Sequence, residues 1–294
     1  MTWYTLAIIS ALFSAAAAIF EKKALLKDSA LNFSTLLATV NLALSLPLFY
    51  FNQAISITDP RLLVLLFKTF FGALAFLFIM KGLKNLQISG ALPLLVLTPG
   101  LVAIAEYFFI NDTITKIETY GIILMLIGTY ALQIDNTKGF FHPITVFIKT
   151  KGRLYLVAAL LIFTATSIID KLLLSEYKLN PKTFFAWQHL FLFIHFTIFS
   201  LIIRLSKGKL DLRKSWKLSW KWILLVSVFT IIYRYSQIEA VKAGKVSLVL
   251  TIKRTSVFFA AIIGGTIFKD TSLLRKAIAI IIMLTGAALI LITF

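Results

Sequence analysis

Hydrophobic residues along this chain form ten long runs that are separated by short polar stretches. We place the runs at residues 2–20, 30–51, 61–80, 86–110, 115–134, 154–174, 183–205, 219–240, 246–268 and 274–293. Each is close to the roughly 20 residues that a helix needs to cross a bilayer. A helix satisfies its own backbone hydrogen bonds in lipid, whereas the strands of a membrane barrel alternate apolar and polar residues. The pattern therefore predicts an all-α integral membrane protein with ten transmembrane helices.

The ten runs divide into two groups of five that resemble one another. A shift of 148 residues superposes Lys23 on Lys171, Leu31-Asn32 on Leu179-Asn180, and Thr35 on Thr183. A shift of 158 residues superposes Lys84 on Lys242, Ser89 on Ser247, Asp112-Thr113 on Asp270-Thr271, Met125 on Met283 and Gly128 on Gly286. An odd number of spans in each unit inverts the second copy in the membrane, an arrangement typical of secondary transporters. We expect one unit at 1–134, an interfacial linker at 135–153 and a second unit at 154–294.

Composition agrees with a membrane protein and limits the available chemistry. Hydrophobic residues make up 60% of the chain, charged residues 14%, and mean hydropathy is +0.93. Without cysteine the chain can form no disulfide, zinc-thiolate or redox site, and the spacing of His189 and His195 does not suit a metal on one helix face. We therefore expect neither a metal nor a cofactor. The net charge of +18 lies mostly in short loops, where lipid head groups explain it better than nucleic acid does.

Lysine and arginine are distributed unevenly between the two sets of loops. The odd-numbered loops carry 19 of them and the even-numbered loops carry 7. Because basic loops favour the cytoplasm, we expect the odd-numbered loops to be cytoplasmic and both termini to be outside. The membrane would be the plasma membrane or a bacterial inner membrane.

Four basic residues fall inside the predicted spans: Lys68, Arg234, Lys253 and Arg254. An ionisable residue within a span is costly and is a functional candidate by default. Counted along their helices, the four lie roughly 6–12 Å below the face formed by the even-numbered loops, and Glu106 is the one clear carboxylate at that depth. This predicts a layer with three surplus positive charges, which would attract an anion. Asp170 and Glu239, near the ends of spans, are expected to contact water.

Neighbouring residues complete the candidate binding site. Arg254 can bind a carboxylate or phosphate through two nitrogens, while Lys253 acts as a point charge. The polar residues on either side of Arg234 line the pocket or pack against other helices: Tyr233, Tyr235 and Gln237. Lys68 binds substrate or extends to the surface. Glu106 is a counter-charge, a structural ion-pair partner or a proton-coupling carboxylate.

The predicted fourth span contains residues that interrupt helices, Pro93 and Pro99-Gly100. Proline within a helix bends the axis and leaves a carbonyl group without its usual donor. We expect these positions to be flexing points for gating between two open states. Close helix packing is the alternative explanation.

Several of the repeated residues resemble the repeat unit of a known family. Residues Lys84-Asn85-Leu86-Gln87-Ile88-Ser89-Gly90-Ala91, then Pro99, Asn111-Asp112-Thr113, Gly121 and Gly128, are similar to the EamA-type unit of the drug/metabolite transporter superfamily. Ala240-Val241-Lys242, Ser247, Lys269-Asp270 and Gly286 repeat the pattern in the second half. The resemblance implies ten helices in two EamA-like units and transport across a membrane.

One segment is similar to a narrower group of relatives. Residues 250–257, around Lys253-Arg254, resemble the ninth helix of plastid sugar-phosphate/phosphate translocators, in which this pair binds the phosphate of the substrate. Those relatives also carry a basic residue on the fourth helix, and Leu95 stands at that position here. The resemblance therefore implies an anionic group on the substrate without implying a phosphate ester.

These features together predict a secondary transporter for a small organic metabolite, anionic or zwitterionic, that works by alternating access. Lys253 and Arg254 would hold the substrate with the help of Arg234. One alternative is an exporter of amino acids or other metabolites in which the buried cations are structural. A transferase acting on a lipid-linked phosphate would need convergent acid–base residues, and a structural membrane subunit would need no buried charges. We expect no enzyme activity, no nucleic-acid partner, and a monomer or homodimer in the bilayer.

Overall fold

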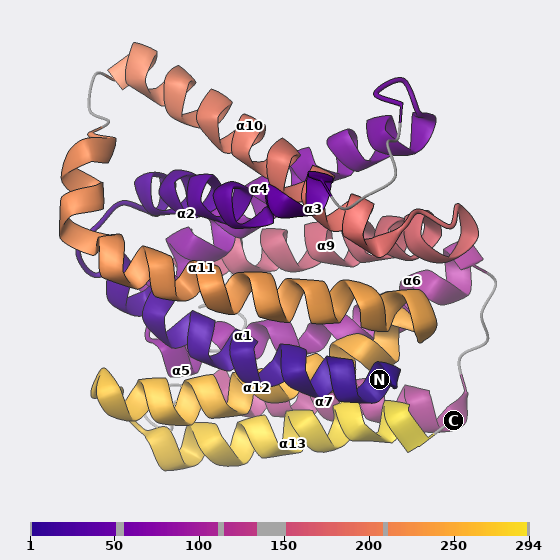
Figure 1. Cartoon of the computed structure of the whole chain (residues 1–294). Coiled ribbons are helices and arrows are strands. Elements are labelled where there is room, and N and C mark those ends of the chain that lie inside the picture. The colour runs from indigo at the N-terminus through magenta and orange to yellow at the C-terminus, as the bar shows by residue number, and fades with distance from the viewer. Residues whose placement is uncertain (1, 51–55, 111–114, 134–150, 208–210, 293–294) are drawn as a thin grey trace.

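The computed structural model describes residues 2–50, 56–110, 115–133, 151–207 and 211–292, and nearly all of them are helical (Figure 1). The first half contains α1 (Trp3–Leu25), α2 (Ala30–Ser45), α3 (Pro47–Tyr50), α4 (Pro60–Asn85), α5 (Ile88–Ala91), the 3-10 helix η1 (Leu92–Leu97), α6 (Thr98–Ile110) and α7 (Lys116–Gln133). The second half contains α9 (Lys151–Lys171), the π-helix η2 (Leu172–Glu176), α10 (Pro181–Lys207), α11 (Leu212–Ala243), α12 (Val246–Ile267) and α13 (Leu273–Ile292). Each of the ten predicted spans corresponds to a helix or to an interrupted helix.

Within the described part of the chain, eight helical segments are long and apolar enough to cross a membrane. They contain α1, α2, α4, α6, α9, α10, α11 and α12. The helix α7 contributes a shorter apolar stretch, Thr119–Gly128. α1 begins and α13 ends at the same end of the bundle (Figure 1), as an even number of crossings requires. The predicted all-α architecture is confirmed for these residues, while most of the predicted linker (135–153) lies outside them.

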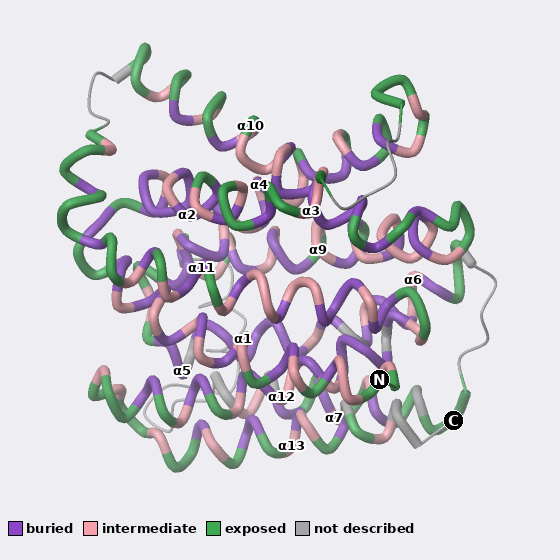
Figure 2. The backbone as a smooth tube through the Cα atoms, in the orientation of Figure 1, coloured by how far each residue is buried: buried purple, intermediate pink, exposed green. Residues whose placement is uncertain are grey.

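Apolar side chains occupy both the inside and the outside of the bundle. Figure 2 shows buried residues on the faces where helices meet and exposed residues on outward faces. Large apolar side chains such as Phe67, Phe108 and Leu126 are exposed. In water such a surface would be unfavourable, but hydrocarbon tails of a bilayer would contact it without cost. The surface therefore agrees with a location in a membrane.

The fourth span is interrupted where the sequence places its prolines. α5, η1 and α6 follow one another without a loop, and Pro93 lies in the first turn of η1. Since proline has no N–H to donate, it ends regular α-helical bonding, and the tighter 3-10 form continues the chain. Pro99 and Gly100 lie in the first turn of α6. The predicted flexing points therefore coincide with a change of helix type, and their role in gating stays a prediction.

Helix packing has the symmetry that an internal repeat predicts. α1 packs against α11 and α12, and its counterpart α9 packs against α4 and α6, which correspond to α11 and α12. α2 packs on its own counterpart α10, and α7 packs on its counterpart α13. Exchanging the two halves thus leaves these helix contacts unchanged. This supports the repeat, and the exact boundaries of its units stay a prediction.

A lysine in each half joins the end of one helix to the end of another. Lys22 near the end of α1 bonds the last turn of α4, and Lys171 at the end of α9 bonds the last turn of α11. The Nζ–O distances are 2.5 Å to Leu83 and 2.8 Å to Leu86 for Lys22, and 3.5 Å to Val241 and 2.8 Å to Gly244 for Lys171. A cation there also offsets the negative end of the helix dipole. These acceptors are related by the 158-residue offset, but Lys22, not Lys23, makes the contact equivalent to that of Lys171.

The equivalent glycines Gly128 on α7 and Gly286 on α13 allow these two helices to approach closely. A Cβ atom at Gly286 would lie 2.6 Å from the Gly121 carbonyl oxygen and 2.8 Å from the Met125 nitrogen. These are backbone atoms, so they cannot move aside as a side chain would. We expect Gly286→Val to separate the helices and to lower the free energy of unfolding by about 1–3 kcal/mol. The measurement is the melting temperature of the purified protein in detergent.

A second glycine provides the control for this prediction. A Cβ atom at Gly72 on α4 would meet no heavy atom within 4 Å. Because alanine favours a helix over glycine by roughly 1 kcal/mol, Gly72→Ala should leave the melting temperature unchanged or raise it. If the melting temperature of Gly286→Val matched that of the parent, the close approach of α7 and α13 would be refuted.

Candidate functional site

A cavity of about 150 Å³ lies between the two halves of the molecule. Its walls come from α1, α2, α4 and η1 of the first half and from α9, α10, α11 and α12 of the second. One water molecule needs roughly 10–15 Å³ of such space, so the cavity can hold about ten waters or a small organic molecule. Its position between the halves is where inverted-repeat transporters hold their substrate.

Six of the eight predicted binding residues line this cavity. They are Lys68, Tyr233, Arg234, Gln237, Lys253 and Arg254. Glu106 is buried on α6 but is not part of the lining. Tyr235 is not part of it either, and its hydroxyl donates to Glu239 at 2.9 Å along α11. The structure therefore brings the predicted cations together without the carboxylate that was expected beside them.

The carboxylates of the cavity are Glu21 on α1 and Asp170 on α9. Asp170 forms an ion pair with Lys68, so the expectation that it is solvated at a span end is wrong. The reason is that η2 continues the helix to Glu176, which places Asp170 roughly 9 Å before the helix end at 1.5 Å per residue. Four cations and two carboxylates line the cavity, so two positive charges are in surplus instead of the predicted three.

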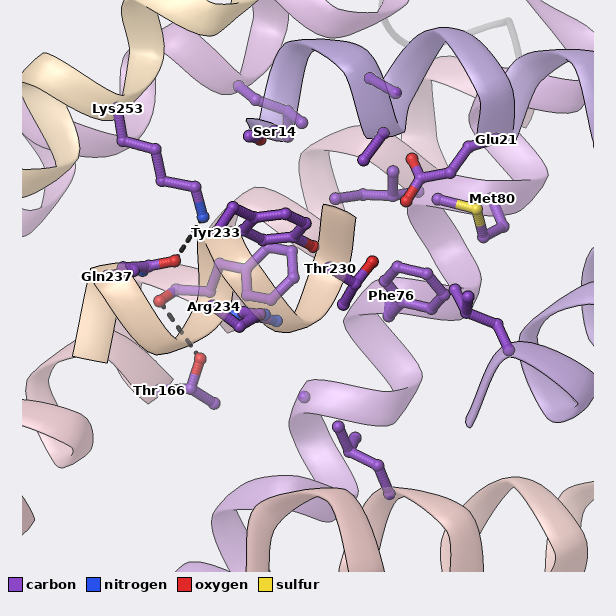
Figure 3. Close-up of a pocket in the computed structure, with 18 of the residues that line it drawn as sticks. Ser14, Glu21, Phe76, Met80, Thr166, Thr230, Tyr233, Arg234, Gln237 and Lys253 are labelled. Carbon is purple, nitrogen blue, oxygen red and sulfur yellow. Dashed lines mark hydrogen bonds between the residues drawn. The ribbon is translucent and has the colours of Figure 1, made fainter. Parts of the chain in front are cut away.

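Three of the cations form the positive wall of the cavity, and we call Arg234, Lys253 and Arg254 the cation group. Lys253 donates to the side-chain oxygen of Gln237, and its Nζ lies 4.9 Å from the centre of the Tyr233 ring. Figure 3 shows Lys253 and Gln237 joined at one end of the view. Arg254 donates from Nη2 to Thr98 Oγ1 at 2.8 Å. Neutral groups hold Lys253 and Arg254, so their charge stays available to a solute.

Several polar atoms on the cavity wall have no hydrogen-bond partner among the described residues. They are Ser34 Oγ, Asn41 Oδ1, Gln188 Oε1 and Arg254 Nε. Buried polar groups in folded proteins almost always have partners, because leaving one unpaired costs about 1–3 kcal/mol. Unpaired donors and acceptors in the lining of one cavity indicate a site built for a polar ligand. The described residues contain no group of three His, Cys, Asp or Glu suited to a metal ion.

Repeated motif residues form a second polar cluster away from the cavity. Asp270 accepts hydrogen bonds from the nitrogen and hydroxyl of Ser89 at 2.9 and 2.5 Å. Lys276 donates to Ser89 Oγ at 3.0 Å and to Gln87 Oε1 at 2.6 Å. The cluster ties α5 of the first half to α13 and its preceding loop. The equivalent motif around Asp112 lies outside the described residues.

Membrane-length helices in two related halves, with a charged cavity between them, define a multi-span membrane transporter. The sequence model of the EamA-like transporter family matches residues 1–133 and 150–292, and the chain belongs to this family. Members of this family are membrane transporters of small molecules and not enzymes. The two matched stretches fall on the two halves described above.

A comparison with solved structures adds evidence for the fold. A structure titled "Crystal structure of protein" has a TM-score of 0.71 and 15% sequence identity, covering 99% of this chain and 96% of that chain. At this identity the likeness concerns the fold alone. No curated protein matches the sequence.

Proposed function

We propose that this protein is a secondary transporter that carries a small organic anion or zwitterion across a membrane by alternating access. The observation that supports it is the cavity between the halves, whose lining has a surplus of two positive charges. Charges buried in a membrane are costly and are retained at substrate pathways. An anionic group on a solute would offset that cost while it is bound.

Each member of the cation group has a distinct role in this proposal. Arg254 holds a carboxylate or phosphate through two of its nitrogens, since its Nε is unpaired and the guanidinium plane matches such groups. Lys253 adds a point charge beside it, and Arg234 approaches from α11. Lys68 is neutralised by Asp170 and shapes the site without attracting the solute. Tyr233 and Gln237 keep the cations in place, and Glu106 and Tyr235 act from outside the lining as structural partners.

Transport requires the cavity to open in turn to each side of the membrane. We propose that the two halves rock against each other and that the interrupted span of α5, η1 and α6, with Pro93, Pro99 and Gly100, absorbs the change. The odd-numbered loops would face the cytoplasm of a cell with this protein in its plasma or inner membrane. Since one chain carries both halves, a monomer suffices, and a homodimer is the alternative.

A ligand screen with matched variants tests the proposed function. Organic anions, zwitterions and amines are added to the purified protein, and the melting temperature is recorded for the parent and for Lys253→Ala/Arg254→Ala. A ligand that binds the folded state raises the melting temperature by mass action. We expect anions or zwitterions to stabilise the parent, with the shift lost in the double variant. Uptake of the stabilising solute into proteoliposomes should be lost with it.

An exposed pair of basic residues provides the control. Arg213 and Lys214 are adjacent on α11, as Lys253 and Arg254 are on α12, and both are exposed. Arg213→Ala/Lys214→Ala removes the same charges and should keep the ligand response. Stabilisation by amines or neutral solutes that persists in Lys253→Ala/Arg254→Ala would overturn the proposal. It would favour instead an exporter in which the cations are structural.

A further inference from the structure

Glu21 is a buried carboxylate on which the charges of Arg234 and Lys253 act through space, without an ion-pair contact. The residue is 6% exposed and lines the cavity. It makes no hydrogen bond or ion pair with any residue that the structure describes, whereas Asp170 is paired with Lys68. Because a buried charge without a direct hydrogen-bond or ion-pair partner is costly, the position of Glu21 in the cavity wall points to a role in binding.

Glu21 and Lys253 lie at different ends of the cavity, and Arg234 lies between them beside Tyr233 (Figure 3). Figure 3 shows Lys253 and Gln237 at one end, Glu21 with Phe76 and Met80 at the other, and Tyr233 between them. The hydrogen bond from Lys22 to the Leu83 carbonyl agrees with this position of Glu21, because it places the neighbouring Glu21 beside the last turns of α4. The cavity therefore has a positive end and a negative end.

The surroundings of Glu21 suit a positively charged amine. Ser34 lies one turn after the start of α2 and Glu21 one turn before the end of α1, and a short turn joins the two helices, so they lie at a similar depth. The Ser34 hydroxyl, unpaired, can accept a hydrogen bond. Phe76, at the same end in Figure 3, offers an aromatic face, to which ammonium groups are attracted. An anion alone would meet repulsion at this end.

We propose that the cavity binds an aminocarboxylate, with its protonated amine toward Glu21 and its carboxylate toward Lys253 and Arg254. This inference rests on the proposed function and narrows its substrate class from anions and zwitterions to solutes that carry both charges. The surplus of two positive charges in the lining favours a solute with a second carboxylate. Such a solute has a net negative charge and still provides the amine that Glu21 requires.

Two pairs of probes that differ by the amino group test the inference: aspartate against succinate, and glutamate against glutarate. Dissociation constants are measured by titration calorimetry on the full-length protein in detergent. We expect the parent to prefer the amino compound in at least one pair by on the order of 10- to 100-fold, the range for a hydrogen bond between charged groups. Glu21→Gln should reduce the ratio to near one by weakening the amino compound and strengthening the deaminated one.

Two further variants separate charge from folding. Glu21→Asp keeps the carboxylate and should keep a preference for the amine, so a loss confined to Glu21→Gln is due to charge. Glu176→Gln changes an exposed glutamate and should leave both affinities as in the parent. A purely structural role of Glu21 would weaken both members of a pair equally.

The outcomes also distinguish this inference from the proposed function. Equal affinity of the parent for both members of each pair, no binding of any probe, or an unchanged ratio in Glu21→Gln overturns the aminocarboxylate assignment. If the probes bind equally and Lys253→Ala/Arg254→Ala abolishes their binding, the proposed function stands while the role of Glu21 fails. If binding is independent of Lys253 and Arg254, the proposed function itself fails.

Discussion

Asp170→Asn is expected to destabilise the protein by about 3–5 kcal/mol, the usual cost of removing one partner from a buried ion pair. Lys68 is 4% exposed, and its Nζ contacts Asp170 and lies 5.0 Å from the centre of the Phe184 ring. Without the carboxylate, Lys68 would keep its charge inside the bundle, and among the described residues the Phe184 ring would remain as its contact. The change is measured as a fall in melting temperature and in the denaturant concentration at mid-unfolding.

A double variant distinguishes loss of the pair from loss of the carboxylate. Lys68→Met/Asp170→Asn removes both charges at similar volume and should recover most of the stability, because no buried charge is then left unpaired. The partly exposed pair of Arg61 and Asp59, 2.7 Å apart, provides the comparison. Asn at position 59 still caps α4, so Asp59→Asn should change the melting temperature little. If Lys68→Met/Asp170→Asn were no more stable than Asp170→Asn, the unpaired charge of Lys68 would not be the cause of the destabilisation.

The ten spans and the cation group could be predicted because both depend on local sequence. A run of apolar residues is enough to predict a membrane helix, and a cation within such a run is conspicuous against it. Lys68, Arg234, Lys253 and Arg254 all line the cavity as a result. Their common depth follows from counting residues along each helix. Neither step requires knowledge of which helices are neighbours.

The cavity carboxylate Glu21 could not be placed in this way because charged residues conceal where a helix ends. The apolar run of the first span stops at residue 20, but α1 continues to Leu25 and carries Glu21 inside the bundle. The extra turn is stable because Lys22 reaches the carbonyl groups at the end of α4. That contact joins residues about sixty positions apart, which hydrophobic periodicity does not reveal. Asp170 fell inside the predicted span 154–174, and its ion pair with Lys68 on α4 could not be predicted from either helix alone.

Glu106 shows a different limit of the sequence, since its depth was predicted but not the side of the helix on which it lies. The six residues of η1 precede it. A 3-10 helix turns by 120° per residue and an α-helix by 100°, so six residues shift the helical phase by roughly 120°. That rotation is enough to move a side chain from a cavity wall to another face. A pattern read with α-helical periodicity across Pro93 therefore gives the wrong face.

Arg254→Lys is expected to weaken binding of succinate and aspartate by roughly 10- to 100-fold, although the charge at position 254 is kept. Arg254 Nη2 is held by Thr98 Oγ1 at 2.8 Å, which fixes the guanidinium plane, and the buried Nε is unpaired. A carboxylate can therefore bind two nitrogens in a fixed geometry, whereas lysine offers a single point charge on a flexible chain. Losing one hydrogen bond between charged groups costs about 1.5–3 kcal/mol, which gives this range.

Calorimetric titration of Arg254→Lys, Arg254→Ala and Arg213→Lys decides between geometry and charge. Arg213 is exposed on α11, so its replacement by lysine should leave the affinity unchanged. If Arg254→Lys binds like the parent while Arg254→Ala does not, Arg254 contributes charge alone and the paired-nitrogen arrangement is wrong. If both variants at 254 lose affinity and Arg213→Lys does not, the solute is held by the guanidinium plane. A planar, two-oxygen group is then required of the substrate, and the neutral solutes of a structural-cation exporter would not fit this cavity.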